Sequence, residues 1–118
     1  MSLHLTPETV ELAYETLRTT MPFCKWQLPH ADEISFRIMT TRDYIGCFRG
    51  VIDGPQEISL SGTRIGSLDT LNRVLAHEMI HLRQEIKRTF TPNTEHNAEF
   101  RKLARTVAKY HCFDPKEL

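Results

Sequence analysis

Cysteine is scarce in this sequence, and the cysteines that are present do not form pairs. Cys24, Cys47 and Cys112 make an odd set without a C-x-x-C spacing. Such a set fits neither a disulfide framework nor a zinc knuckle built on cysteines. We therefore expect these residues to remain unpaired in a reducing compartment, with Cys47 serving as a small core residue of a strand.

Long apolar runs and an excess of charge of one sign are also missing. No stretch approaches the ~18 apolar residues that span a bilayer, and residues 1–8 lack the basic start and apolar run of a secretory signal. Fifteen basic and fifteen acidic residues cancel, so the overall charge gives no argument for a nucleic-acid or membrane partner. We expect a cytoplasmic protein that does not associate with membranes.

What the chain does contain is the composition of an ordinary globular domain. It has 118 residues, of which 40% are hydrophobic and 25% charged. This length fits one domain, and that share of apolar residues is enough for a buried core. Repeats, linkers and low-complexity segments are absent from the sequence. We predict a single domain spanning residues 1–118.

Local patterns predict an α+β fold in the order helix, three strands, helix, helix. Thr6 and Pro7 form a helix start, with a cap followed by a proline at the first helical position. Alternating apolar residues predict strands, which form an antiparallel or mixed sheet. The predicted strands cover 34–38, 43–49 and 57–61, and the helices run from 7 to about 21, from 67 to about 88 and from about 95 to 110.

The second predicted helix contains His77-Glu78-Met79-Ile80-His81, an H-E-x-x-H motif. Residues four apart lie one turn apart on the same helix face, so both imidazoles can reach one zinc ion at about 2.0–2.1 Å. Glu78 points about a quarter turn away, which suits a general base that acts on a water molecule. Such a motif can also arise by chance, and the two histidines could be solvated side chains on the polar face of the helix.

His96 supplies the context that favours a metal site. In the predicted last helix it shares a face with Phe100 and Val107, so we expect it to point inward, where an unpaired polar ring is costly. A lone inward histidine more often bonds to a carbonyl, but residues 89–95 can span about 23 Å and return His96 to the ion. Three protein nitrogens leave the fourth tetrahedral position open, as in catalytic zinc sites.

These residues resemble a known family. The segment from Val74 to His81, followed after fourteen residues by His96-Asn97-Ala98-Glu99-Phe100, is similar to the SprT-like metallopeptidase domain found in SprT and Spartan. That domain carries H-E-x-x-H on one helix and H-G-x-x-F at the start of the next, so Asn97 replaces the usual glycine. The resemblance covers roughly the whole chain and corresponds to a minimal domain without a C-terminal zinc ribbon.

The resemblance implies both a fold and an activity. It implies a small zincin-like domain that binds one Zn²⁺ through His77, His81 and His96 and uses Glu78 as the catalytic base. The expected function is that of a zinc-dependent endopeptidase acting on a protein or peptide. Association with DNA is implied by the family alone. Among the strands, we expect Glu57–Ser61 to pair with an extended substrate by β-augmentation.

Some alternatives remain open at this point. Glu99 could replace His96 as the third ligand or could orient it, and Tyr44, Tyr110 and His111 carry donors that could stabilise an oxyanion. A different class of function is a zinc-containing module that binds DNA or protein without cleaving it. Its contact surface would include basic residues of the last two helices, namely Arg83, Lys87, Arg88, Arg101, Lys102, Arg105 and Lys109.

Overall fold

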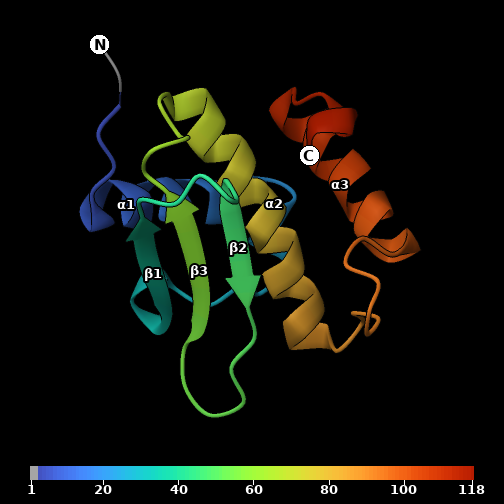
Figure 1. Cartoon of the computed structure of the whole chain (residues 1–118). Coiled ribbons are helices and arrows are strands. Elements are labelled where there is room, and N and C mark those ends of the chain that lie inside the picture. The colour runs from blue at the N-terminus through green and yellow to red at the C-terminus, as the bar shows by residue number, and fades with distance from the viewer. Residues whose placement is uncertain (1–2) are drawn as a thin grey trace.

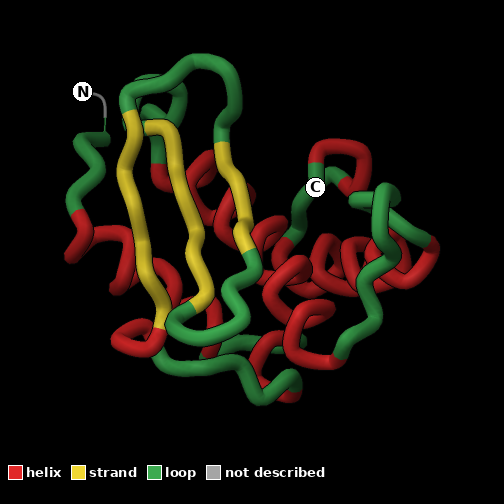
Figure 2. Tube along the Cα trace, turned by 60° about the horizontal axis from the view of Figure 1, so that its bottom comes forward, coloured by secondary structure: helices red, strands yellow, loops and turns green. Residues whose placement is uncertain are grey.

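Helices from both ends of the chain pack on one side of a three-stranded sheet (Figures 1 and 2). The computed structural model describes residues 3–118, so the first two residues of the segment examined for a secretory signal, Met1 and Ser2, lie outside it. The elements are α1 (Pro7–Arg18), β1 (Ile34–Met39), β2 (Gly46–Arg49), β3 (Gln56–Ser61), α2 (Leu68–Lys87) and α3 (Ala98–His111), with 3₁₀ turns at Phe23–Lys25, Ala31–Glu33 and Pro115–Glu117. The predicted order of elements and the α+β class are confirmed.

Each of the three α-helices begins at a polar side chain that caps its first turn. The hydroxyl of Thr6 accepts a hydrogen bond from the backbone N–H three residues later at 3.1 Å, and the hydroxyl of Ser67 accepts the equivalent bond at 3.2 Å. Asn97 caps α3 in the same way at 2.9 Å. These bonds satisfy backbone donors that a helix start leaves free. The predicted starts of α1 and α2 are confirmed.

The sheet is mixed, with strand order β1-β3-β2. β1 pairs with β3 in parallel, and β2 pairs with β3 in the antiparallel direction. The chain therefore passes from β1 to the opposite edge and returns to the centre through the turn at residues 50–55 (Figure 1). The second strand is shorter than the predicted Asp43–Arg49, because residues 43–45 belong to the connection that crosses the end of β3.

The helices form two further layers on one side of the sheet. α1 and α2 lie behind the strands, and α3 packs on the side of α2 away from the sheet (Figures 1 and 2). α2 is thus enclosed between the sheet and α3, and its apolar face fills the core. The fully buried core side chains include Tyr14, Phe23, Ile58, Leu60, Leu71, Leu75, Met79, Ile80, Leu82 and Val107.

Three local predictions are wrong. α3 begins at Ala98, not near Glu95, so His96 lies in the loop before the helix and its side chain is exposed instead of turned into the core. Asn97 decides this boundary because its side chain caps the helix. Cys47 is also exposed, although we expected a core position, and like the other two cysteines it is a free thiol. The helical period predicts that Leu68 and Ile86 share the apolar face of α2 with Leu71 and Leu75, but both side chains, at the two ends of the helix, are exposed.

None of the helices within residues 3–118 combines the length and the apolar character that crossing a membrane requires.

The buried hydroxyl of Tyr14 makes it possible to measure how much a single hydrogen bond stabilises the core. Its side chain has no exposed surface, and its hydroxyl donates to the carbonyl oxygen of Pro29 at 2.6 Å. We predict that Tyr14→Phe lowers the free energy of unfolding by about 1–2 kcal/mol, because the carbonyl loses its buried donor. Urea denaturation measures this change. The matched control is Tyr110→Phe on the half-exposed Tyr110, which should shift stability by less than ~0.5 kcal/mol; equal effects of the two changes would contradict the prediction.

Candidate metal centre

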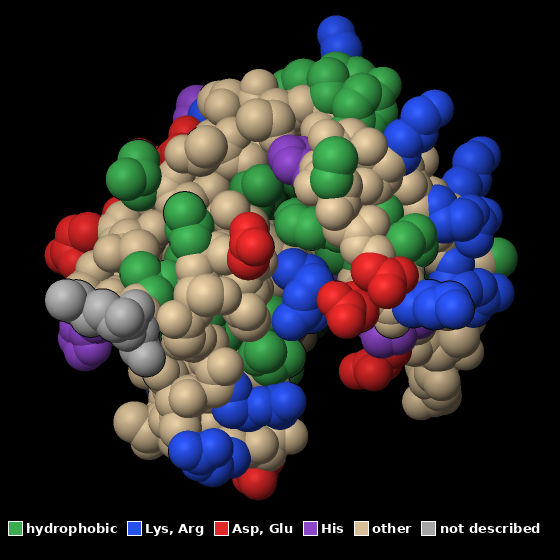
Figure 3. Space-filling model, turned by 90° about the horizontal axis from the view of Figure 1, so that it is seen from above, with side chains coloured by type: hydrophobic (Ala, Val, Ile, Leu, Met, Phe, Trp, Pro, Cys, Tyr) green, Lys and Arg blue, Asp and Glu red, His purple; other side chains and the backbone are tan. Residues whose placement is uncertain are grey.

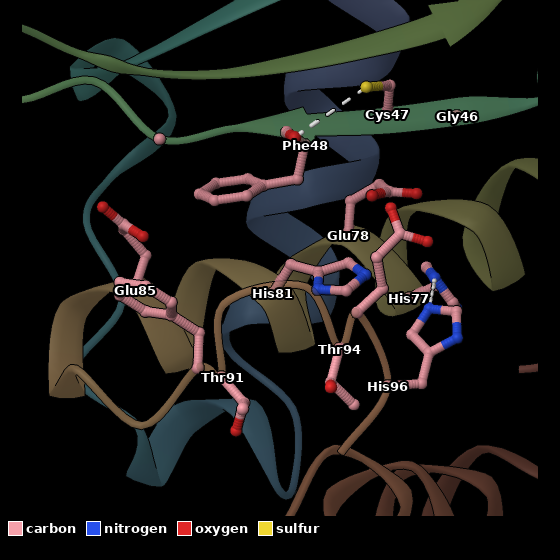
Figure 4. Close-up of a pocket in the computed structure, with 13 residues that line it drawn as sticks. Gly46, Cys47, Phe48, His77, Glu78, His81, Glu85, Thr91, Thr94 and His96 are labelled. Carbon is pink, nitrogen blue, oxygen red and sulfur yellow. Dashed lines mark hydrogen bonds between the residues drawn. The ribbon is translucent and has the colours of Figure 1, made fainter.

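Three histidine side chains from two segments of the chain come together beside β2. His77 and His81 lie one turn apart on α2, and His96 reaches them from the loop between α2 and α3. One ring nitrogen of each histidine lies within 4.8 Å of the others, and the Nε2 atoms of His77 and His96 are 3.2 Å apart. Figure 4 shows the three rings converging in one pocket. The structure thus brings together the three residues that the sequence predicted as ligands.

The chemistry of these nitrogens fits a zinc ion. Tetrahedral coordination at about 2.0–2.1 Å requires ligand nitrogens about 3.3 Å apart, which His77 and His96 already approach. Burial, reinforced by the neighbouring histidines, lowers the pKa of His77 and His81 to about 4. Both rings are therefore neutral near pH 7 and keep a lone pair free for a metal. Three histidine nitrogens leave room in the tetrahedral coordination shell for a further ligand.

Phe100 forms the apolar support of this cluster. Its side chain is 2% exposed, and its ring centroid lies 5.0 Å from that of His77, 4.6 Å from His81 and 4.5 Å from His96. Because one rigid ring contacts all three imidazoles, it limits the positions that they can adopt. Phe100 also lies in the first turn of α3, so the packing of that helix is coupled to the histidine cluster.

Glu78 lies next to the histidines but is buried between α2 and β2. Its side chain is only 4% exposed, and burial, with a smaller contribution from Glu95, raises the pKa of Glu78 to about 8. The carboxyl group approaches Gly46 so closely that a Cβ atom there would lie 3.0 Å from Glu78 Oε2 and 2.6 Å from the side chain of Val74. A side chain at this point of β2 would therefore clash with Val74 first and would also crowd the carboxyl group of Glu78.

A cleft of about 440 Å³ opens over the histidines and Glu78. Phe48 points into it from β2, whereas Cys47 points to the opposite side of the strand (Figure 4). The sequence did not single out several of the residues that line the cleft, because they come from β2, the end of α2 and separate loops, with no common motif. They are Gly46, Phe48, Gly50, Glu85, Phe90, Thr91, Thr94 and Glu95.

The strand beside the cleft is β2, not the predicted Glu57–Ser61. That segment belongs to β3, which is the central strand and has a partner on each side, so it has no free edge. The backbone N–H of Ser61 donates to the carbonyl oxygen of Ile45 at 3.0 Å. Because pairing alternates along an antiparallel ladder, Gly46 and Phe48 turn their N–H and C=O groups toward the free edge.

The other candidates proposed from the sequence do not reach the centre. Tyr44, Tyr110 and His111 are absent from the lining of the cleft, and Tyr110 is 53% exposed on α3. The His111 ring instead contacts the hydroxyl of Thr20 at 3.1 Å. Glu99 is held away from the metal centre by Gln84, whose side-chain amide donates to it at 3.0 Å. The histidine cluster therefore involves His96 and not Glu99.

The comparison with known families agrees with this geometry. The model of the SprT-like family matches residues 4–116, which is nearly the whole chain. The chain belongs to the SprT-like family. No curated protein and no solved structure matches it. Membership in the SprT-like family is consistent with a metallopeptidase-like domain, and the three histidines occupy the positions that the motif predicts for metal ligands.

The third ligand of this SprT-like centre can be tested by metal titration. We predict that the parent protein binds about one zinc ion per chain and that His96→Ala weakens binding at least about 100-fold, because only two nitrogens remain on α2. Glu99→Ala should retain much more of the affinity, since Glu99 bonds to Gln84 and not to the centre. Competition with a chromophoric chelator measures the zinc affinity of the parent protein and of both variants. Loss of zinc in the Glu99 variant with retention in the His96 variant would show that the ligand is misassigned.

The burial of Glu78 predicts that removing its carboxyl group makes the metal-free protein more stable. The pKa of Glu78 in the folded state, about 8, lies above the ordinary value of 4.5. The contribution of Glu78 to the free energy of unfolding is therefore most favourable below pH 4.5 and is lost as the pH rises to 8. In the metal-free protein, Glu78→Gln should therefore raise the free energy of unfolding by roughly 2–4 kcal/mol at pH 8 and by little at pH 5.

Urea denaturation of the parent protein and the Glu78→Gln variant, with a chelator present and between pH 5 and pH 8, measures the difference in their free energies of unfolding. His77 and His81 have lowered pKa values, so their stabilising effect is lost as the pH falls from 6.5 to 4. Because both proteins contain these histidines, their effect cancels in the subtraction. A difference that does not grow between pH 5 and pH 8 would contradict the assigned environment of Glu78.

Proposed function

We propose that this protein is a zinc-dependent endopeptidase in which His77, His81 and His96 hold the metal and Glu78 is the general base. The observation that carries the proposal is the position of a buried carboxyl group beside three converging imidazoles in an open cleft. A site that only stabilised the fold would gain from a closed ligand set, and it would not require a costly buried carboxyl group.

The residues of the cleft account for the steps of hydrolysis. Bound zinc would polarise the scissile carbonyl and make a water molecule more acidic. Glu78 would accept the proton of that water on a carboxylate oxygen and transfer it to the nitrogen of the leaving amine. Burial raises the pKa of Glu78 in the metal-free protein, and the positive charge of a bound metal ion would favour the carboxylate form that accepts the proton.

The free edge of β2 supports an extended polypeptide as the substrate. The outward backbone groups of Gly46 and Phe48 could pair with the substrate as an added strand, and the Phe48 ring offers an apolar contact. A second cavity, of about 200 Å³, shares Gly46, His77 and Glu78 with the main cleft. Substrate could therefore continue on both sides of the cleaved bond, which favours an endopeptidase over an exopeptidase.

A second candidate function is binding to DNA or protein without cleavage, and α3 offers one observation in its favour. Arg101, Lys102, Arg105 and Lys109 are exposed on this helix, and Figure 3 shows Lys and Arg side chains gathered on the side where α3 lies. Such a surface could contact phosphates. Arg83 does not belong to it, since it packs against Trp26 and donates to that residue's carbonyl oxygen at 3.1 Å. We regard DNA association as an addition to catalysis, because Glu78 has no function in a binding module.

Glu78→Gln separates the two functions. The change keeps the shape of the side chain but removes the proton acceptor, so we predict that zinc binding persists while cleavage of an unfolded protein falls by roughly 10²–10⁴-fold. Fluorescently labelled casein measures cleavage, and elemental analysis measures zinc. His96→Ala is the control that should lose both. If the Gln variant cleaves at the parent rate, Glu78 is not the base; if the zinc-loaded parent protein cleaves nothing, the binding function is favoured.

A further inference from the structure

The third histidine stands on a segment that the hydrophobic core does not hold. Residues 86–96 are all exposed, so burial of apolar side chains contributes little to their position. The segment includes Arg88 and Asn93, both in the left-handed region with φ of 59° and 65°. A loop of this kind would normally sample many conformations. Apart from the packing of the His96 ring on Phe100, polar contacts must therefore fix the place of this segment relative to α2.

The side chain of Asn97 supplies four such contacts. Its Oδ1 accepts hydrogen bonds from Gln84 Nε2 at 2.9 Å and from the backbone N–H of Phe100 at 2.9 Å. Its Nδ2 donates to the carbonyl oxygen of Thr89 at 3.0 Å and to the hydroxyl of Thr91 at 2.9 Å. One amide thus connects α2, both ends of the loop and the first turn of α3, and it uses the full donor and acceptor capacity of an asparagine.

Gln84 connects this amide to the helix that carries the other two histidines. Its side chain is 1% exposed and donates to Asn97 and to Glu99, the latter at 3.0 Å. Gln84 follows His81 by three residues and His77 by seven, so the three side chains share one face of α2. The anchor of the loop and the two helical ligands are therefore fixed on the same rigid element.

We propose that Asn97, anchored by Gln84, is the positioning residue that holds His96 where it can complete the metal site. The inference rests on the proposed function only in taking His96 as a metal ligand. His96 itself makes two further polar contacts: its Nε2 atom lies 3.2 Å from Nε2 of His77, and its carbonyl oxygen accepts a hydrogen bond from Arg101 at 2.7 Å. Because Arg101 is exposed, it restrains the loop less than the partly buried amide does.

Two substitutions of Asn97 separate positioning from simple helix capping. Glycine is only slightly worse than asparagine at a helix start, and aspartate caps equally well while adding a charge that favours both the helix N-terminus and a cation. A capping role alone therefore predicts that both variants keep their zinc affinity. A positioning role predicts weaker zinc binding in both, since glycine removes all four contacts and aspartate places a carboxylate oxygen against the carbonyl of Thr89.

The experiment compares Asn97→Gly and Asn97→Asp with the parent protein in three measurements. Zinc affinity is measured by chelator competition, and unfolding of the metal-free protein by urea. Amide hydrogen exchange of residues 89–96 is measured without metal. We expect about 10–100-fold weaker zinc binding and faster exchange in the loop. The matched control is Thr6→Gly, which removes the cap of α1 and should leave zinc affinity unchanged.

Gln84→Leu tests the anchor. This change removes the donor and puts an apolar side chain of similar size in the buried position. It should therefore weaken zinc binding, as the Asn97 variants do. If the two residues act as one unit, the double variant with Asn97→Gly should bind zinc no more weakly than the worse single variant. Multiplied effects in the double variant would instead show independent actions and overturn the role assigned to Gln84.

The failure of this proposal differs from failure of the proposed function. Zinc affinity and loop exchange that stay at the parent level in both Asn97 variants would overturn the positioning role, whatever the activity. If the parent protein itself bound no zinc, the metallopeptidase assignment would fail. The exchange measurement would still decide whether Asn97 holds the loop.

Discussion

α2 has to satisfy two environments at once, and the rest of the structure depends on this constraint. One face of the helix fills the core through Leu71, Leu75 and Met79, which have no exposed surface. The adjoining face presents His77 and His81 to the cleft. Because the first face is fixed by packing against the sheet and α1, the direction of the histidines is fixed as well. The two ligands on α2 therefore gain their rigidity from the core.

This arrangement places functional groups where they oppose folding. The carboxyl group of Glu78 and the rings of His77 and His81 all have pKa values shifted toward the neutral form by burial, which means that their charged forms are unfavourable in the folded state. A protein selected for stability alone would replace them. Their clustering at one end of a cleft, within two turns of one helix, is the pattern expected where stability has been exchanged for chemistry.

The sequence was informative where local chemistry decides the structure. The cap at Thr6 and the helical pattern from residue 67 marked two helix starts, and the four-residue spacing in α2 placed two histidines on one face. It was less informative where distant segments meet. Alternation identified β3 as a strand but could not show that it lies between β1 and β2, and this order decides which edge is free for a substrate. Likewise, a helical period extended back to His96 misplaced the start of α3, because the preference of Asn97 for the cap position ends the helix there.

His96 illustrates why a metal site can combine rigid and mobile ligands. Two nitrogens fixed on α2 leave the third to be supplied by an exposed loop, and ordering that loop costs conformational entropy that metal binding must offset. The bonds from Asn97 and Gln84 reduce this cost before any metal arrives, since they limit the loop in the metal-free protein. A looser loop would give the same ligands and a lower affinity. Metal affinity here thus depends on amide groups that never touch the ion, as much as on the imidazoles that could hold it.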